Sequence, residues 1–294
     1  HCCSICDLVS DIHELPVKLI TDSELERVVR DADGVMTSVG IIDGKTNATQ
    51  QIPANALVLS TGFETFDPSG KILWGYGTMP GVLTLAELDE IMREDRLADL
   101  LADSDTARIA FFQCVGSRDK SIGANYCSQY CCKAALRSAV QIKTLRPDWD
   151  LSVFYIDLQV AGKYASSLLE NARRLGIEVS QGVPGEINRE NEHKLSVLRE
   201  KDGKNIKEEF DKIILSVGLR PGTASETLSR ITGVALNQHG FFQGRNELDP
   251  NRTFANGVYL AGACGGPMDI ETTSLNAAAA ASDIIQDFSC CLKV

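Results

Sequence analysis

Long hydrophobic runs are absent from this sequence of 294 residues, so no segment has the length of a membrane-spanning helix. Basic residues are few beside acidic ones: 29 Lys and Arg against 40 Asp and Glu leave a net charge of −11. A surface of that sign repels phosphates, which argues against nucleic acid as a partner. The first residues, HCCSICDLV, have no basic segment ahead of an apolar one, so we expect neither a signal peptide nor membrane insertion.

Histidine is also scarce, and its four copies are scattered through the chain. None stands in a pattern for nucleophilic catalysis, and no pair of carboxylates suggests acid–base chemistry. Cysteine is the exception, with ten copies. Ten are too few for a disulfide scaffold in a chain of this length, and their clustering indicates reduced thiols and a cytoplasmic location. Cysteine chemistry is therefore the first candidate for function.

Four cysteines lie in one run, FFQCVGSRDKSIGANYCSQYCCKAAL, at Cys114, Cys127, Cys131 and Cys132. The apolar residues 108–112 predict a buried strand that ends at Cys114. Residues 125–144 predict a helix on which Cys127 and Cys131, four apart, share a face. The positive end of the helix dipole favours thiolates over thiols. Four thiolates brought together in this way are a ligand set that suits a [4Fe–4S] cluster or zinc.

Other interpretations of the four cysteines stay open. Buried cysteine is common as a small apolar side chain, and a pair of these residues could form a redox disulfide without metal. The spacing matches neither the paired C-x-x-C of zinc ribbons nor the ferredoxin pattern. Four cysteines within a short run, two of them adjacent, are hard to explain as packing alone, and an iron–sulfur cluster is favoured.

The hydrophobic pattern predicts an α/β protein. From residue 108 to 181, strand and helix patterns alternate, which predicts a parallel sheet with right-handed crossovers. Hairpins are expected around Asp43-Gly44 and Asp202-Gly203. Further strands are expected at 17–21, 56–60, 212–217 and 257–261, further helices at 87–103 and 273–288, and a helix or turn near residue 23.

Several segments resemble one family in order along the chain: QCVGSRD with YCSQYCCKAAL, LSTGFETFDP, WGYGTMPGVLTLAELDEIM, VFYIDLQVAGK, HGFFQ and GVYLAGACGGPMDIETTSLNAAAAA. They are similar to the A subunits of heterodisulfide reductases and to their relatives, including the A subunit of the quinone-interacting membrane-bound oxidoreductase complex. The resemblance implies a cytoplasmic flavoprotein with two dinucleotide-binding folds, like thioredoxin reductase. It also implies FAD, a [4Fe–4S] cluster on Cys114, Cys127, Cys131 and Cys132, and partner chains equivalent to the B and C subunits of heterodisulfide reductase.

The same resemblance implies a division of the chain and a flavin site. Residues 1–104 and 219–294 would form two parts of the FAD-binding domain, and residues 105–218 would form a NAD(P)-domain-like unit that carries the cysteines. The flavin contacts would be Thr61, Gly62, Gly262, Ala263, Asp269 and Ile270. Asp269 has an equally plain interpretation as a helix N-cap. Flavin-binding relatives usually have Gly-Asp where this chain has Gly262-Ala263, which weakens the expected ribityl contact.

Two glycine-rich loops are missing. No G-x-G-x-x-G opens the chain, although an FAD-binding fold of this type needs one for the pyrophosphate, so we expect a fragment that lacks an N-terminal βαβ unit. The loop at residues 115–119 has a single glycine, so nicotinamide binding there is not expected. Cys3 and Cys6 form a C-x-x-C that could bind metal or act in redox chemistry. No ferredoxin-type C-x-x-C-x-x-C-x-x-x-C-P run is present.

The sequence thus predicts an oxidoreductase subunit in which FAD handles electron pairs and the cysteine-held cluster passes single electrons to partner subunits. One alternative is a pyridine-nucleotide disulfide oxidoreductase in which Cys131 or Cys132 attacks a disulfide. A second alternative is a cluster-bearing docking module with no turnover of its own.

Overall fold

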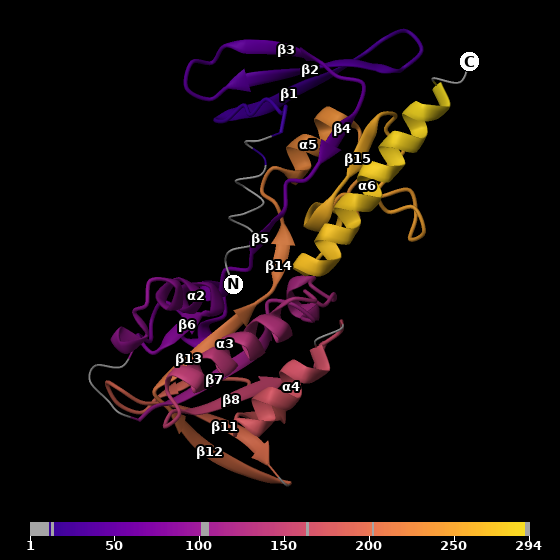
Figure 1. The fold of residues 1–294 in the computed structure, drawn as a ribbon. Coiled ribbons are helices and arrows are strands. Elements are labelled where there is room, and N and C mark those ends of the chain that lie inside the picture. Colours follow the sequence, from indigo (N-terminus) through magenta and orange to yellow (C-terminus); the bar gives the residue numbers. More distant parts are fainter. Residues whose placement is uncertain (1–11, 13–14, 101–105, 163–164, 202, 292–294) are drawn as a thin grey trace.

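The computed structural model describes residues 12, 15–100, 106–162, 165–201 and 203–291, so Cys3 and Cys6 lie outside the described residues. Its elements form two lobes joined by a narrow ribbon (Figure 1). We name residues 66–217 the cysteine lobe, and residues 23–60 with 222–291 the terminal lobe. Among the described residues, no helix is long and apolar enough to cross a membrane.

A five-stranded parallel sheet is the centre of the cysteine lobe. Its strands are β6 (Val82–Thr84), β7 (Arg108–Val115), β8 (Asp150–Tyr155), β9 (Glu178–Gln181) and β13 (Lys212–Val217), in the order β6-β13-β7-β8-β9. Helix α3 (Cys131–Leu145) connects β7 to β8, and α4 (Ala165–Arg174) connects β8 to β9. The predicted α/β class and parallel sheet are confirmed. Strand β6 and α2 (Leu85–Arg93) lie in this lobe, although the expected division placed them with residues 1–104.

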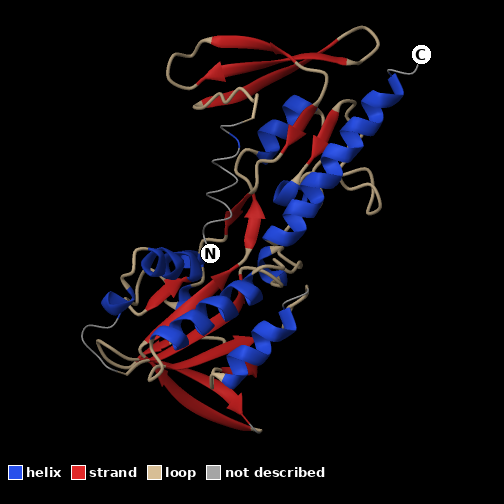
Figure 2. Cartoon of the chain, in the orientation of Figure 1, coloured by secondary structure: helices blue, strands red, loops and turns tan. Residues whose placement is uncertain are grey.

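Both faces of this sheet are covered, which explains the uninterrupted apolar sequence of β7. Ile109 and Phe111 point to one face, where they pack with side chains of α2, α3 and α4. Ala110 and Phe112 point to the other face, where they pack against a three-stranded antiparallel sheet. That second sheet consists of β10 (Asn188–Arg189), β11 (Leu195–Lys201) and β12 (Lys204–Phe210) (Figure 2). Strands buried on both faces lose the polar alternation of half-exposed ones.

The terminal lobe combines segments from both ends of the chain. Strands β1 (Ser23–Arg30), β2 (Met36–Asp43) and β3 (Thr49–Pro53) form an antiparallel sheet. Strand β4 (Leu57–Leu59) pairs in parallel with β15 (Val258–Leu260), beside α5 (Ser225–Thr232) and α6 (Ile270–Cys291). A core that includes Met36, Leu59, Phe242 and Leu260 holds these elements together.

The ribbon between the lobes consists of β5 (Phe63–Thr65) and β14 (Leu219–Pro221), which pair antiparallel. Strand β5 follows β4 after Gly62, and β14 follows β13 after Gly218. Short 3₁₀ turns complete the chain at Pro68–Gly70, Ile72–Trp74, Leu97–Leu100, Lys120–Ile122 and Gly262–Gly265.

Four expected elements differ from the structure. Residues 17–21 are not a strand, and the helix or turn expected near residue 23 is strand β1, which pairs with β2. The helix expected at 87–103 ends at Arg93, because Asp95 adopts φ 57° and the Arg96 N–H turns back to the Ile91 carbonyl. The helix expected at 125–144 begins only at Cys131.

Candidate functional site

The four cysteines of the run lie at the carboxyl end of the central strand β7. Cys114 is near the end of that strand, Cys127 is in the following loop, and Cys131 and Cys132 open α3. Strand order reverses here: β8 and β9 lie on one side of β7, and β13 and β6 on the other. Open α/β sheets bind ligands at such a switch point. Cys114, Cys131 and Cys132 are buried, and Cys127 is half-buried.

Cys127 does not share a helix face with Cys131, which corrects the expectation from the sequence. Gln129 between them adopts φ 61°, a left-handed conformation that ends any helix. Cys114 at φ 62° and Arg118 at φ 55° are also left-handed. Such conformations cost about 1–3 kcal/mol each and gather at functional sites, where the surroundings impose them.

Tertiary hydrogen bonds impose this loop conformation. Ser128 is buried, and its Oγ accepts from the Leu219 N–H at 2.9 Å. The hydroxyls of Tyr126 and Tyr130 donate to the carbonyls of Leu219 and Val217 at 2.7 and 2.9 Å. The residues that flank Cys127 are thus fixed to the end of β13 and the start of the ribbon, so the thiol has a defined position before any ligand binds.

Close backbone approach at two glycines makes the site compact. A Cβ on Gly218 would lie 2.8 Å from Ser117 Cβ and 2.9 Å from Ser128 Oγ. Gly116 has φ 76°, and a Cβ there would overlap the ring of Phe66 at 2.1 Å. Both positions need glycine because there is no room for a side chain. The Phe66 ring thus occupies the space against the single glycine of the loop.

The four thiols change one another's pKa values. Burial raises the pKa of Cys114 to about 11, and the negative charge of Cys132 adds to the effect. Burial likewise raises the pKa of Cys127. The hydrogen bond between Cys131 and Cys132 raises the pKa of Cys131 and lowers that of Cys132. Because all four groups interact electrostatically, the site resists carrying four thiolate charges unless a cation neutralises them.

Donors for sulfur surround the thiols. The Gln129 N–H donates to Cys127 Sγ at 3.3 Å. In the loop after β8, the backbone N–H of Ile156 opposes the larger effect of burial on the pKa of Cys114, and that of Gln159 adds to the lowering of the Cys132 pKa by Cys131. The Arg118 guanidinium also favours both thiolates, although Asp157 partly neutralises it in an ion pair.

Zinc and an iron–sulfur cluster make different demands on these four thiols. Zinc needs its four ligand atoms about 2.0–2.3 Å from one centre. Among the described residues, no group of three or more His, Cys, Asp or Glu side chains is arranged to hold a metal ion. A [4Fe–4S] cluster has an iron at each of four corners and takes more widely spaced thiolates, and hydrogen bonds to its sulfurs tune it. Three buried thiols and one half-buried thiol, which interact with one another and have N–H donors, are residue types that fit that group.

Part of the expected flavin site is brought together in the terminal lobe. Strands β4 and β15 lie side by side, and the Ala261 N–H donates to the Leu59 carbonyl at 2.9 Å. Thr61-Gly62 and Gly262-Ala263 therefore leave the same edge of this strand pair. Gly62 (φ 69°) and Gly262 (φ 74°) are both left-handed, which allows close approach of a ligand to the backbone.

Asp269 and Ile270 lie at the start of α6. The Asp269 carboxylate accepts from the Thr272 N–H at 2.8 Å, which is the N-cap geometry. It also forms an ion pair with Lys133 of α3. Burial alone would raise the pKa of Asp269, but the hydrogen bonds from Lys133 and Thr272 outweigh burial and lower it. The Ile270 side chain is 69% exposed.

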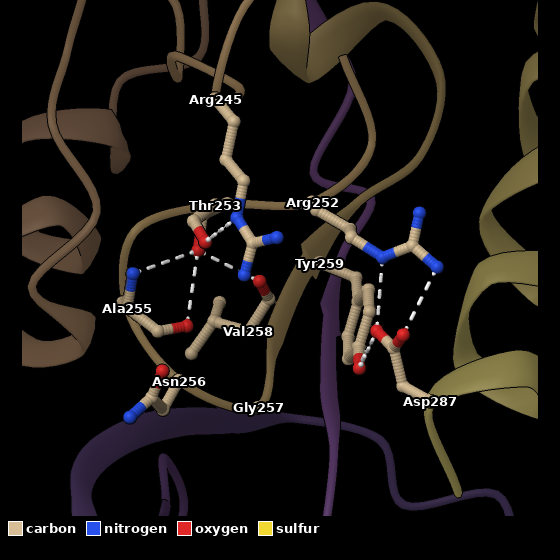
Figure 3. A pocket seen from close by; sticks show the side chains of 9 residues that line it. All are labelled: Arg245, Arg252, Thr253, Ala255, Asn256, Gly257, Val258, Tyr259 and Asp287. Carbon is tan, nitrogen blue, oxygen red and sulfur yellow. Dashed lines mark hydrogen bonds and ion pairs between the residues drawn. The ribbon is translucent and has the colours of Figure 1, made fainter. Parts of the chain in front are cut away.

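A small cavity of about 160 Å³ lies elsewhere in the terminal lobe, away from the expected site residues. In Figure 3, Arg252 and Tyr259 both reach Asp287 of α6, at 2.9 and 3.0 Å, on one side of it. Arg245 spans the other side, and its Nε donates to the Thr253 carbonyl at 3.1 Å. These contacts connect the loop before β15 to α6, so Arg245, Arg252 and Tyr259 have a structural role.

Sequence reasoning missed the residues that surround the thiols. Ile156 and Gln159 act through backbone N–H groups, which leave no side-chain signature. Lys133 follows the cysteine pair directly, but its partner Asp269 is 136 positions away. The segment VFYIDLQVAGK, which contributed to the resemblance, is the one pointer to the loop after β8.

No family model matches the chain. Among curated proteins, it is 34% identical over 242 residues to the A subunit of the H(2):CoB-CoM heterodisulfide,ferredoxin reductase of Methanothermobacter thermautotrophicus, covering 79% of this chain and 37% of that protein. It is 32% identical over 237 residues to an iron-sulfur A subunit of the CoB--CoM heterodisulfide reductase of Methanopyrus kandleri, covering 77% and 36%. The chain thus spans about a third of the length of these curated relatives.

Two solved structures have a similar fold. Thioredoxin reductase from T. acidophilum has a TM-score of 0.57 at 16% identity, over 97% of this chain and 80% of that one. Thioredoxin reductase from Lactococcus lactis, in its FR conformation, has a TM-score of 0.54 at 16% identity, over 90% and 74%. At this identity the likeness shows the fold alone, and it confirms the expected thioredoxin-reductase-like class.

Proposed function

This chain belongs to the family of heterodisulfide reductase A subunits, and from that premise we propose that it is an electron-transfer oxidoreductase. Cys114, Cys127, Cys131 and Cys132 would hold a [4Fe–4S] cluster, and the terminal lobe would contribute to an FAD site. Electrons would pass between the two groups and on to partner chains equivalent to the B and C subunits of heterodisulfide reductase. The relatives are named as A subunits, which supports partner chains here.

The observation that carries the proposal is the convergence of four thiols at the switch point of the sheet. Their fixed loop and their N–H donors support a pre-organised cage for a cluster. Arg118 and the positive end of α3 offset the negative charge that such a group would bring. The protein would supply orientation and tune the potential, while the cluster supplies one-electron chemistry.

For FAD, the proposal rests on Thr61, Gly62, Gly262 and Ala263, which leave one edge of the β4–β15 pair. Flavin supplies two-electron chemistry when it is bound. The two left-handed glycines would let backbone N–H groups approach it. Asp269 would act through the start of α6, which it caps, rather than by a direct ribityl contact.

Anaerobic reconstitution with iron and sulfide tests the cluster. We expect four irons and four acid-labile sulfides per chain, with an EPR signal on reduction. Single replacement of Cys114, Cys127, Cys131 or Cys132 by Ala should lose most of the iron, because one missing thiolate opens the cage. Cys264→Ala is the matched control, since Cys264 is also buried but lies in the terminal lobe with its Sγ donating to the Leu59 carbonyl. Full iron loading in three of the four variants would place the metal elsewhere.

One observation favours a second candidate, a disulfide oxidoreductase. Cys131 hydrogen-bonds to Cys132 and thereby favours the thiolate of Cys132, the form that attacks disulfides. If the reconstituted chain held no iron and a single Cys131 or Cys132 replacement abolished thiol–disulfide exchange, this function would be preferred.

A further inference from the structure

The cysteine run is also the surface by which the cysteine lobe meets the terminal lobe. Tyr126, which precedes Cys127, packs its ring against His239 and Phe241 of the terminal lobe, with ring centroids 4.7 and 5.5 Å apart. Lys133, which follows Cys132, forms an ion pair with Asp269 at the start of α6. Residues directly beside two of the four thiols therefore bridge the lobes. In Figure 1, the lower end of α6 meets the loop and helix that carry the cysteines.

The Lys133–Asp269 pair is well placed to hold the lobes together. The Lys133 side chain is 25% exposed and that of Asp269 is 17%, so water screens the pair only partly. Asp269 is itself fixed, because the same carboxylate caps α6 through the Thr272 N–H. Gly162 adds a third segment: a Cβ on it would lie 3.6 Å from Lys133 Nζ and 3.0 Å from Glu271 Oε2.

The covalent connection does not fix the lobes by itself. The ribbon is a two-stranded pair with three residues in each strand, β5 and β14. An isolated two-stranded ribbon is only marginally stable and can twist. The orientation of the lobes, and with it the separation of the cysteine site from the β4–β15 edge, must therefore depend on the side-chain contacts across the interface.

We infer that Lys133 is a positioning residue that holds the start of α3 against the start of α6. This inference rests on the proposed function, because it assigns the contact the task of keeping the cluster and flavin sites at a separation that allows electron transfer. Neither Lys133 nor Asp269 needs to touch either group. The pair acts by narrowing the range of lobe orientations.

Distance measurement in the full chain tests the inference without any cofactor. Spin labels attached to non-natural amino acids at Leu198, 55% exposed in β11, and at Leu248, 97% exposed in the terminal lobe, leave the cysteines untouched. We expect Lys133→Met to broaden the pulsed-EPR distance distribution. The ratio of closed molecules, whose lobes are in contact, to open molecules, whose lobes are apart, should fall about tenfold, which is the effect of losing roughly 1.4 kcal/mol. Lys133→Arg keeps the charge and should restore the narrow distribution.

The matched control is Arg137→Met, on the same helix, which removes an exposed ion pair to Asp89 within the cysteine lobe. It should leave the distribution unchanged. High salt should broaden the distribution of the unaltered protein and have little effect on Lys133→Met, because salt screens a charge pair. A distribution that stays narrow and unshifted in Lys133→Met would overturn the inference, whether or not the chain binds a cluster.

In the loaded protein, a pulse of a one-electron photoreductant should reduce the cluster, and the electron should then pass to the flavin. We expect the rate of this transfer to fall about tenfold in Lys133→Met, in proportion to the fraction of molecules whose lobes are in contact. The midpoint potentials of the two groups should stay as they were, and Lys133→Arg should recover the rate. An unchanged rate with a broadened distance distribution would overturn the positioning role, whereas absence of cluster and flavin would refute the proposed function alone.

Discussion

Gly218→Ala tests how tightly the cysteine site is built. Gly218 connects β13 to the ribbon, and its N–H donates to the Val115 carbonyl at 2.7 Å, which ties it to the end of β7. An added Cβ would lie 2.8 Å from Ser117 Cβ, 2.9 Å from Ser128 Oγ and 3.2 Å from the Gly116 carbonyl oxygen. Real Cβ atoms do not approach so closely, so the loop that holds Cys127 must move away from the sheet.

The size of the effect follows from two opposing contributions. Inserting a methyl into a packed interior costs about 1–3 kcal/mol. Replacing glycine also restricts the unfolded chain, which stabilises the folded state by about 0.4–1 kcal/mol. The free energy of unfolding should therefore fall by about 1–2 kcal/mol. With a denaturant slope of about 2 kcal/mol per M, the urea midpoint of the cysteine lobe falls by roughly 0.5–1 M.

Gly222→Ala is the matched control, because a Cβ there has its nearest neighbours at 3.8 Å, an ordinary contact. Urea unfolding followed by the fluorescence of Trp74 and Trp149, both in the cysteine lobe, measures the stability, and iron content after reconstitution measures the site. We expect Gly218→Ala to unfold earlier and bind less iron, and Gly222→Ala to match the parent. Equal midpoints and equal iron in the two variants would refute this close packing.

Two further predictions concern the cysteine lobe. Arg199→Met should lower the free energy of unfolding by about 2–3 kcal/mol, because the Arg199 side chain is 5% exposed and pairs with Glu178. In the same urea experiment, the control Arg137→Met, at an exposed ion pair, should lower it by less than about 0.5 kcal/mol. The pKa of Glu178 is lowered in the folded protein, so the ionised Glu178 stabilises the fold fully above the ordinary pKa of 4.5, and this stabilisation is lost as pH falls below it. Acid unfolding that is identical in Arg199→Met and the parent would contradict the role of the Arg199–Glu178 pair. NADH and NADPH should reduce the loaded protein slowly and without saturation, since Phe66 fills the space at Gly116 where a pyrophosphate would bind; fast, saturable stopped-flow reduction would contradict it.

Local sequence predicted the elements whose hydrogen bonds and packing follow a regular pattern. Strand β7 was found because its apolar run is buried on both faces. The hairpin of β11 and β12 was found because Asp202-Gly203 separates two strand-like segments. The cysteine residues could be selected from sequence because residue type and clustering carry the chemistry.

Other features depend on contacts between residues far apart in the chain. The expected helix from residue 125 was wrong because the Ser128 hydroxyl bonds to Leu219, 91 positions away, and outweighs the local preference of the segment. A helix or turn was expected near residue 23, but the structure has strand β1 there, which pairs with β2. No local window of sequence around residue 125 contains Leu219.

The architecture also explains how the proposed cluster site could stand where a dinucleotide fold binds pyrophosphate. The start of α3 points positive N–H dipoles toward the switch point, and these favour an anion of either kind. A dinucleotide needs a short glycine loop so that the helix begins close to its phosphates. Here residues 116–130 intervene between β7 and α3, and they bring Cys127 and Arg118 into the space. In the proposed site the N–H groups at the start of α3 would remain, and the ligand set would change from backbone N–H groups alone to thiolates supported by N–H groups.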